Sequence, residues 1–410
     1  MQFSVLFLLY SCTLGLLVGV VAAVFLIATN VLTDFVWVSV PEMIFIPGYP
    51  IIVGLIGGIL VGLIQTKIGN YPTTIEETVG EFKKTGRVEY KRQLSKIALS
   101  AVIVLMFGAS LGPEAALAGI VGGLVTWMGD HLKVTLENKE ELLKLSLSAM
   151  LSAVFRAPLV GLGDAFEEEK KEPLQTKTRT RRIILYVLST LFGFVGFLFV
   201  KKLVHEESVF ALHFSKDIAW NWQAVLLSPL GWLFGGVFGF LFLQIEKITN
   251  ALSKKINHPV IKALLAGLSI GIFAWWSPYF IFSGERQLLP FSKEALQLSL
   301  VSLLVLGIGK AFLTNFCFSF GWRGGKIFPA IFSSAAIGFA FVQLFPYTPG
   351  LTVGVIVGSS VTIILGQPYV SAALLLLLFP IQFFPGILIS CWGINKLKNH
   401  IQGKSLLRKN

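Results

Sequence analysis

The chain alternates long apolar stretches with short clusters of charged residues, and this pattern predicts a helical protein that crosses a membrane many times. A helix that spans the hydrocarbon core of a bilayer needs about 20 predominantly apolar residues. The stretches that meet or approach this length are residues 3–30, 50–68, 97–129, 145–166, 183–200, 224–243, 263–280, 298–320, 330–345 and 351–392. The first contains no Lys or Arg and is longer than the core of a signal peptide, so we expect a retained first span.

Polar or helix-breaking segments between these stretches are predicted to be connections. They are residues 34–50, 69–74, 130–144, 170–182, 246–262 and 283–286. The segment 69–74 leads into an amphipathic stretch that runs to Lys96, and the strongly charged segment 170–182 marks the midpoint of the chain. Lys and Arg are abundant in both regions and in the tail from Lys396, which by the positive-inside rule places them in the cytoplasm. We therefore expect a multi-pass protein of the cell (inner) membrane with both termini cytoplasmic.

Breaks caused by Gly and Pro recur in corresponding positions of the two halves. Gly112-Pro113 is followed by Ala157-Pro158, and the segment 325–329 is followed by Gln367-Pro368. Paired interrupted spans indicate an inverted repeat with a binding site near the membrane midplane, although Gly/Pro-rich helices can resemble each other by chance. We expect a first membrane repeat at 1–182, a second at 183–395 and a short basic cytoplasmic tail at 396–410.

Composition supports a membrane protein and changes how the net charge is interpreted. Hydrophobic residues make up 54% of the chain and charged residues only 14%, and the mean hydropathy is +0.76. A net charge of +12 would suggest nucleic-acid binding in a soluble protein. In a chain this apolar, basic cytoplasmic loops explain it better, so no nucleic-acid partner is expected and membrane lipids are.

Cysteine and histidine give no sign of a metal site or a cofactor. Cys12, Cys317 and Cys391 lie far apart in apolar stretches without a CxxC pair. The five histidines are scattered, and no HExxH occurs. The sequence therefore indicates neither a disulfide framework nor metal catalysis.

Glu114 is the side chain most indicative of function. It is the only ionisable residue between Ile97 and Gly129. A carboxylate within an apolar span is costly and usually marks a transport or relay site. Because Gly112-Pro113 breaks the helix just before it, free backbone N–H groups are expected beside it, as in an anion site. A helix cap or a hydrogen-bonded interhelical Glu is the alternative interpretation.

At these breaks the chain resembles the CLC family of chloride channels and chloride/proton antiporters. The segment 110–114, Ser-Leu-Gly-Pro-Glu, resembles the family's G-[RK]-E-G-P motif in a bacterial form. Residues 155–161 followed by 166–168 resemble F-N-A-P-L-A-G…E-E, and 325–329 resembles G-x-F-x-P. Residues 69–72 stand where the family has G-S-G-I-P. The resemblance implies an all-α membrane fold of two inverted-topology halves with broken helices, and a homodimer with one anion pathway per subunit.

The resemblance also implies roles for individual residues. Glu114 is similar to the external gating glutamate, and Glu168 is similar to the internal proton glutamate that antiporters tend to keep. Lys326 and Ile327 would line the anion site with backbone N–H groups. The other candidate anion-binding residues are Gly69, Asn70 and Ala115. A solvated residue in a charged run remains the alternative for Glu168.

Several positions differ from the family pattern. Gly69 stands at the position of the central serine, so Asn70 is the remaining candidate donor there. Pro113 replaces the basic residue before the gating glutamate, and Phe328 sits one place late in its motif. The region 381–384 contains no tyrosine that would match the family's ligand. These differences leave the identity of the anion open.

A rival hypothesis comes from Gly161-Leu162-Gly163-Asp164, a literal GxGD motif of intramembrane aspartyl proteases. Such hydrolysis needs two carboxylates that share a proton. The chain has only three other Asp residues, Asp34, Asp130 and Asp217, all at span ends or in polar connections. We therefore expect Asp164 to form hydrogen bonds within the helix bundle and the protein not to be an enzyme.

The sequence as a whole favours an anion transporter, with chloride/proton exchange as the leading prediction. Two glutamates, Glu114 and Glu168, would serve coupled exchange of an anion and a proton. A passive channel for chloride, or for another anion such as fluoride, would need only one gate and is the alternative.

Overall fold

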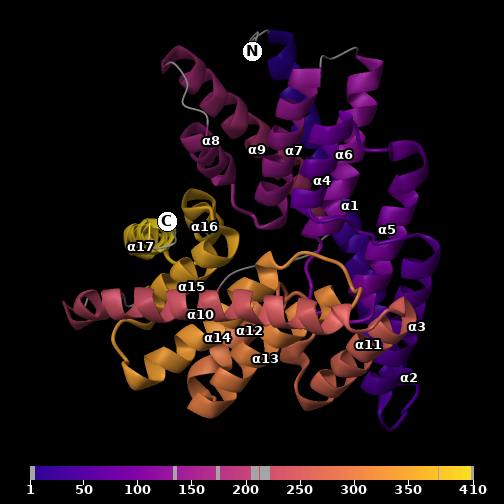
Figure 1. The fold of residues 1–410 in the computed structure, drawn as a ribbon, viewed down its shortest axis with the longest axis vertical. Coiled ribbons are helices and arrows are strands. Elements are labelled where there is room, and N and C mark those ends of the chain that lie inside the picture. The colour runs from indigo at the N-terminus through magenta and orange to yellow at the C-terminus, as the bar shows by residue number, and fades with distance from the viewer. Residues whose placement is uncertain are drawn as a thin grey trace.

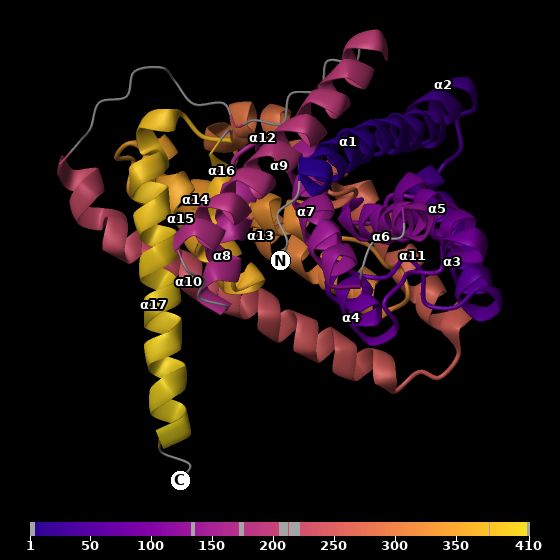
Figure 2. The same ribbon diagram turned by 90° about the horizontal axis from the view of Figure 1, so that it is seen from above.

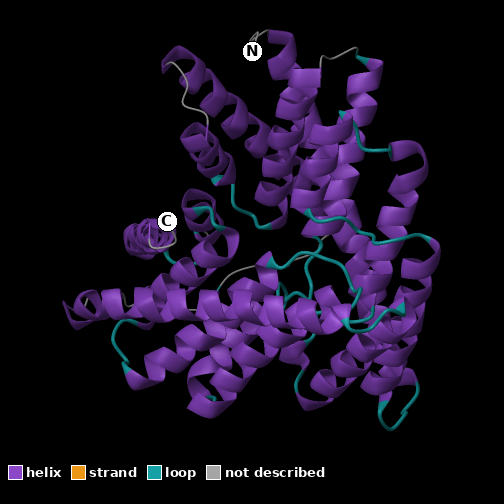
Figure 3. Cartoon of the chain, viewed as in Figure 1, coloured by secondary structure: helices purple, strands orange, loops and turns teal. Residues whose placement is uncertain are grey.

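The computed structural model describes residues 5–132, 136–171, 176–204, 212, 222–376 and 378–407. Within these residues all regular elements are helices (Figure 3). Seven helical segments of the described chain are long and apolar enough to cross a membrane. They are Val5–Met43, Tyr49–Lys67, Thr178–Val204, Val225–Lys254, Pro259–Trp276, Leu300–Ser319 and Ile327–Leu344. A multi-pass membrane architecture, as predicted, follows from this list.

The two halves of the chain lie in different parts of the molecule (Figure 1). The first half comprises α1 (Val5–Asp34), η1 (Phe35–Ser39), α2 (Val40–Met43), α3 (Tyr49–Lys67), α4 (Ile75–Thr85), α5 (Tyr90–Met106), α6 (Glu114–His131), α7 (Leu136–Val154), α8 (Val160–Lys171) and α9 (Thr176–Val204). The second half comprises α10 (Trp222–Lys254), α11 (Pro259–Trp276), η2 (Pro278–Phe280), α12 (Leu288–Glu294), η3 (Ala295–Gln297), α13 (Leu300–Ser319), α14 (Ile327–Leu344), α15 (Pro349–Leu365), α16 (Pro368–Leu375), η4 (Ile381–Phe383) and α17 (Phe384–Leu407).

The predicted helix breaks are confirmed. Helix α7 ends at Val154 and α8 begins at Val160, so the chain is non-helical around Ala157-Pro158. Arg156, inside this break, has a left-handed φ of 51°. Gly366 likewise ends α15 with a φ of 71°, and α16 then begins at Pro368. Proline lacks an N–H and fits the first turn of a helix, as Pro368 does in α16, whereas Pro158 lies two residues before α8 begins.

Three of the predicted connections were wrong because helix continues through most of each. The segment 34–50 is helical to Met43, and the chain turns only around Gly48. In the segment 130–144, α7 begins at Leu136. In the segment 246–262, α10 continues to Lys254. In the last two, charged side chains have partners, such as Lys139 with Asp130 at 2.8 Å and Lys326 with Glu246 at 2.6 Å.

Two smaller boundaries also differ from expectation. The amphipathic stretch to Lys96 is divided, because Gly86 (φ 71°) ends α4 and α5 begins at Tyr90. The basic tail from Lys396 continues α17 as far as Leu407. Figure 2 shows this last helix extending away from the body of the molecule.

Glycines allow the long helices to approach closely. Helix α3 packs on α11 where Gly54 faces Gly267, and a Cβ atom on either glycine would lie 2.1 Å from the carbonyl oxygen of the other. Helix α1 packs on α9 in the same way, since a Cβ on Gly19 would lie 1.9 Å from the carbonyl oxygen of Gly193. In lipid the hydrophobic effect does not drive helices together, and close packing at small residues stabilises their contacts instead.

We predict that Gly54→Ala lowers the melting temperature of the protein in detergent, because its methyl group would overlap Gly267. Overpacking of this kind costs about 1–3 kcal/mol. Gly80→Ala is the matched control, since no atom lies within 4 Å of a Cβ there. The control should be neutral or stabilising by up to about 1 kcal/mol, because alanine favours helix. Equal melting temperatures for the two variants would contradict the close α3–α11 packing.

Candidate functional site

The starts of two broken helices meet at a pair of glycines. The backbone N–H of Gly112 donates to the carbonyl of Gly325, and that of Gly325 donates to the carbonyl of Gly112, both at 2.7 Å. Helix α6 begins two residues after Gly112, and α14 begins two residues after Gly325. The positive ends of both helix dipoles therefore point to one region between the two halves of the chain.

The Glu114 carboxylate lies in this region. Glu114 is the first residue of α6, and only 1% of its surface is exposed. Its Oε1 accepts a hydrogen bond from the backbone N–H of Phe328 at 3.3 Å, and the N–H of Ile327 also faces the carboxylate. Among the described residues, its Oε2 has no hydrogen-bond partner. One carboxylate thus occupies a place at the N-terminus of α14 where an anion would bind.

The two glycines are required by the position of this carboxylate. A Cβ on Gly112 would lie 1.9 Å from Glu114 Oε2, and one on Gly325 would lie 1.8 Å from the same atom. No side chain fits at either position while Glu114 remains where it is. The sequence indicated that Gly112 breaks a helix, but it did not indicate this contact.

A buried lysine supports the segment that precedes the site. Lys310 on α13 is fully buried, and its Nζ lies 2.9–3.3 Å from the carbonyl oxygens of residues 279–282. The N–H of Phe282 in turn donates to the carbonyl of Gly108 at 3.2 Å. Ser110 and Thr314, also on α13, share a hydrogen bond of 3.0 Å. Residues 108–110 are thereby fixed directly before Gly112.

Not all of the predicted anion-binding residues lie next to the Glu114 carboxylate. Ala115 is buried in the first turn of α6, and Ile327 is the first residue of α14. Lys326 precedes α14, and its side chain extends to Glu246 on α10. The hydrogen bond to Glu114 comes from Phe328, which sequence reasoning had missed. The signal available was that Phe328 occupies the second position of a helix after a Gly-rich break.

Gly69 and Asn70 lie in the loop between α3 and α4. Asn70 is exposed, and no hydrogen bond within the described chain joins it to Glu114. This loop is attached to the one before α14, because Gln65 Nε2 donates to the carbonyls of Tyr71 (3.2 Å) and Gly321 (2.9 Å). Arg323 adds a second attachment.

Arg323 links the same two loops through a carbonyl and a carboxylate. Its Nε donates to the carbonyl of Pro72 at 3.1 Å, and its guanidinium pairs with Glu77 on α4. Burial raises the pKa of Glu77, but hydrogen bonds from Arg323 and Thr74 outweigh it and hold that pKa below its usual range. Glu77 therefore stays ionised and keeps the loops joined at neutral pH.

Glu168 lies on α8 in a partly buried ion pair. Its Oε2 is 2.8 Å from Lys144 Nζ on α7, and 16% of its side chain is exposed. The neighbouring Glu167 accepts a hydrogen bond from the backbone N–H of Tyr369 at 2.8 Å, at the start of α16. The two adjacent glutamates are thus engaged with different helices, and Glu168 is more than a solvated residue in a charged run.

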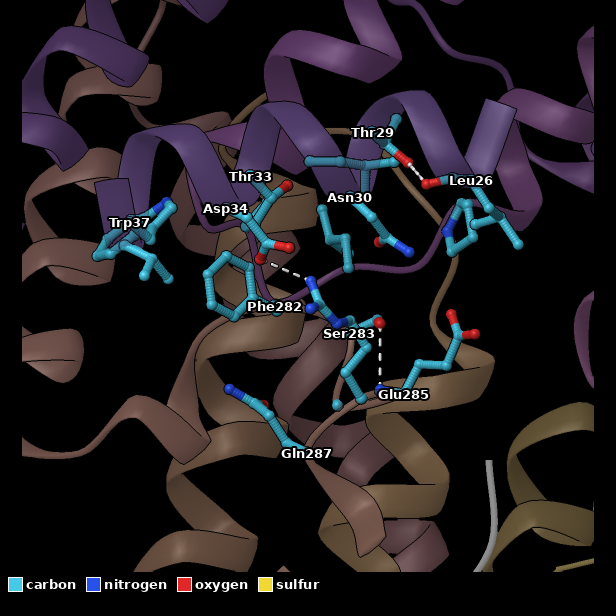
Figure 4. Close-up of a pocket in the computed structure, with 17 residues that line it drawn as sticks. Leu26, Thr29, Asn30, Thr33, Asp34, Trp37, Phe282, Ser283, Glu285 and Gln287 are labelled. Atoms are coloured by element: carbon cyan, nitrogen blue, oxygen red, sulfur yellow. Dashed lines mark hydrogen bonds and ion pairs between the residues drawn. The ribbon is translucent and has the colours of Figure 1, made fainter. Parts of the chain in front are cut away.

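A cavity of about 210 Å³ borders the residues directly before Glu114 (Figure 4). Leu111 and Pro113 line it together with α1 and residues 282–287. Asp34 of α1 reaches Arg286 across it, with 2.7 Å between Oδ1 and Nη1. Solvent in this cavity would approach the segment that carries Glu114 directly.

The structure does not assemble a pair of aspartates around Asp164. Asp164 accepts a hydrogen bond from Ser148 on α7, as expected for a residue bonded within the bundle. Asp34 and Asp130 pair with Arg286 and Lys139, and Asp217 lies outside the described residues. No group of three or more potential metal ligands occurs in the described part of the chain.

Comparison with protein families gives a match to the family model described as "Voltage gated chloride channel" over residues 57–393. An uncharacterised protein of Methanocaldococcus jannaschii is 25% identical over 296 residues, which are 72% of this chain and 70% of that protein. The H(+)/Cl(-) exchange transporter ClcA of Vibrio campbellii is 25% identical over 235 residues, or 56% of this chain. The aligned part is about half the length (48%) of that transporter.

Two solved structures share the fold over nearly the whole chain. A slow cyanobacterial Cl-/H+ antiporter superposes with a TM-score of 0.79 at 21% identity, covering 98% of this chain and 96% of its own. A CLC-type fluoride/proton antiporter superposes with a TM-score of 0.70 at 16% identity, covering 96% of both chains. The predicted all-α membrane fold with broken helices is thereby confirmed.

We predict that Gly325→Ala destabilises the protein mainly through Glu114. The new Cβ would overlap the carboxylate, so the loss of stability should shrink when Glu114→Ala is present as well. For residues in contact, the coupling free energy is about 0.5–3 kcal/mol. Melting temperatures of both single variants and the double variant in detergent measure it. The control pairs Gly325→Ala with Glu168→Ala, which should be additive. Additive behaviour with Glu114→Ala would contradict the contact.

Proposed function

Because this chain belongs to the CLC family of voltage gated chloride channels, we propose that it is a membrane transporter that exchanges chloride for protons. The observation that carries the proposal is the Glu114 carboxylate, buried at the N-terminus of α14 and bound to the N–H of Phe328. The names of the matched Vibrio transporter and of the cyanobacterial antiporter support chloride and protons as the substrates.

Anion and proton binding are linked at this position. The carboxylate of Glu114 and a permeating anion compete for the same N–H groups at the helix starts. Protonation removes the negative charge of Glu114 and weakens its hold on these groups, which lets an anion replace it. By linkage, anion binding then favours the protonated form of Glu114 to the same degree. A single carboxylate therefore couples the two substrates.

Glu168 would supply protons to Glu114 from the cytoplasmic side of the membrane. It lies where α8 meets the charged segment 170–182, which the positive-inside rule assigns to the cytoplasm. Its pair with Lys144 holds it at the edge of the buried helices. The second carboxylate favours exchange over a passive anion channel, in which one gate would suffice. Ala115, Lys326 and Ile327 would contribute backbone to the anion site.

Further expectations follow from the family. We propose a homodimer with one pathway in each subunit, in the cell (inner) membrane, with both termini in the cytoplasm and no enzymatic activity. The halves 1–182 and 183–395 would be the two inverted repeats, and the tail 396–410 would be cytoplasmic. The position of Gly69 in place of a serine removes a hydroxyl ligand, and Asn70 is the proposed substitute.

The first experiment compares wild type, Glu114→Gln and Glu168→Gln in proteoliposomes with a chloride gradient and a pH electrode. The wild type should drive protons uphill as chloride flows. Both variants should move chloride while proton pumping falls by at least about tenfold, because each lacks a proton carrier. Glu169→Gln is the matched control, since Glu169 is paired with Arg179 at 2.9 Å. Chloride flux without proton pumping in the wild type would establish a passive channel instead.

A second prediction concerns pH. Chloride flux in the wild type should rise as the pH falls, because protonation of Glu114 vacates the N–H groups. Glu114→Gln is permanently neutral, so its chloride flux should be nearly independent of pH. Initial rates of chloride efflux at matched internal and external pH measure this. A variant that keeps the wild-type pH profile would exclude Glu114 as the gate. A wild type that moves no chloride, but moves fluoride, would assign a different anion.

A further inference from the structure

Three helices of the first half share a column of polar side chains with a spacing of one helical turn. Residues four apart lie on the same face of a helix. Helix α7 presents Lys144, Ser148 and Ser152; α8 presents Glu168 and Asp164; α9 presents Arg182, Tyr186 and Thr190. Helix α8 runs opposite to α7 in this region, because the chain turns at residues 155–159.

Contacts between the helices divide this column into three levels. At the first level, Lys144 pairs with Glu168 at 2.8 Å. At the second level, one turn deeper on both helices, Ser148 Oγ donates to Asp164 Oδ2. At the third level, Ser152 Oγ donates to the carbonyl of Thr190 at 3.3 Å. The column thus proceeds from an ion pair to a hydroxyl and a carboxylate, and then to a hydroxyl and a backbone carbonyl.

The column is closed off from bulk solvent along α7 and α9. Ser148 is 2% exposed, Tyr186 is 1% exposed, and Ser152 and Thr190 are fully buried. The Tyr186 hydroxyl has no hydrogen-bond partner among the described residues. The charges of Glu141, Asp164 and Glu168 all act on it. A buried hydroxyl among carboxylates can hold a proton or a water molecule.

The deep end of the column leads toward the Glu114 site. Three residues after Ser152, the ring of Phe155 stacks on that of Phe328 with 4.0 Å between centroids. The N–H of Phe328 holds the Glu114 carboxylate. From Ser148 to Val154, the last residue of α7, the helix advances about 9 Å at about 1.5 Å per residue. Asp164 therefore lies between Glu168 and Glu114 along the direction in which protons must travel.

We propose that Asp164 is a second internal proton carrier, which accepts protons from Glu168 and passes them by way of Tyr186 and Ser152 toward Glu114. In each step the O–H bond of the donor breaks and an O–H bond of the acceptor forms, directly or through water, with no other bond changed. The inference rests on the proposed anion/proton exchange. Ionisable side chains inside a membrane commonly form such relays.

The groups around Asp164 fit a carboxylate that changes charge. Helix α7 contributes Glu141 and Lys144, α8 contributes Glu168, and α9 contributes Arg182 with Tyr186. Lys144 already pairs with Glu168, and Arg182 already pairs with Glu141 at 3.4 Å. Asp164 itself receives the neutral hydroxyl of Ser148, which can donate to the ionised form and accept from the protonated form. Both protonation states of Asp164 are thereby accommodated.

The test measures chloride flux and chloride-driven proton pumping in proteoliposomes for Asp164→Asn and Asp164→Glu. Asp164→Asn should keep chloride flux and lose proton pumping by at least about tenfold, because the amide cannot carry a proton. Asp164→Glu keeps a carboxyl group and should retain pumping. Asp130→Asn is the matched control, since Asp130 pairs with Lys139 at the end of α6. Asp130→Asn should move chloride and pump protons as the wild type does.

The outcomes separate this inference from the proposed function. If Glu168→Gln uncouples protons but Asp164→Asn pumps like the wild type, the relay is wrong and exchange stands. If Asp164→Asn and Asp164→Glu both lose chloride flux as well, Asp164 is a structural residue and the relay is overturned. If the wild type moves chloride without pumping protons, exchange itself fails and the relay fails with it.

Discussion

The pairing of Gly112 with Gly325 is the constraint on which the rest of the structure depends. Two reciprocal hydrogen bonds of 2.7 Å hold the starts of α6 and α14 against each other. Inside a membrane, free backbone groups must be satisfied by protein or line a cavity. The glycines satisfy each other, and the next N–H groups of α14 are left for the Glu114 carboxylate. A side chain on either glycine would occupy the space of that carboxylate.

Opposite charges satisfy opposite ends of the interrupted backbone. The carboxylate of Glu114 receives an N–H at a helix start. The ammonium of Lys310 does the reverse, because it binds the carbonyl oxygens of the irregular segment 279–282. That segment holds Gly108, which precedes Gly112. Two buried ionisable groups that would each be costly alone therefore make a non-helical crossing possible within the membrane.

The sequence predicted the features that depend on local chemistry. The helices break at Ala157-Pro158 and Gln367-Pro368 as expected, and Glu114 was identified as the lone ionisable group in its span. Features that depend on partners far along the chain were missed. Helix α10 continues past Glu246, and Lys326, from the loop before α14, pairs with that carboxylate. The contact of Phe328 with Glu114 also needed the pairing of two glycines that no local pattern reveals.

The site has little positive charge apart from the helix starts. No Lys or Arg occurs between Ile97 and Gly129. The basic residues just before α14 are already paired, Arg323 with Glu77 and Lys326 with Glu246. Backbone N–H groups thus provide the main attraction for an anion, and they act over only about one turn of helix. Among the described residues no Lys or Arg side chain pairs with the Glu114 carboxylate. This supports the proposal that the protonation state of Glu114 controls the entry of an anion.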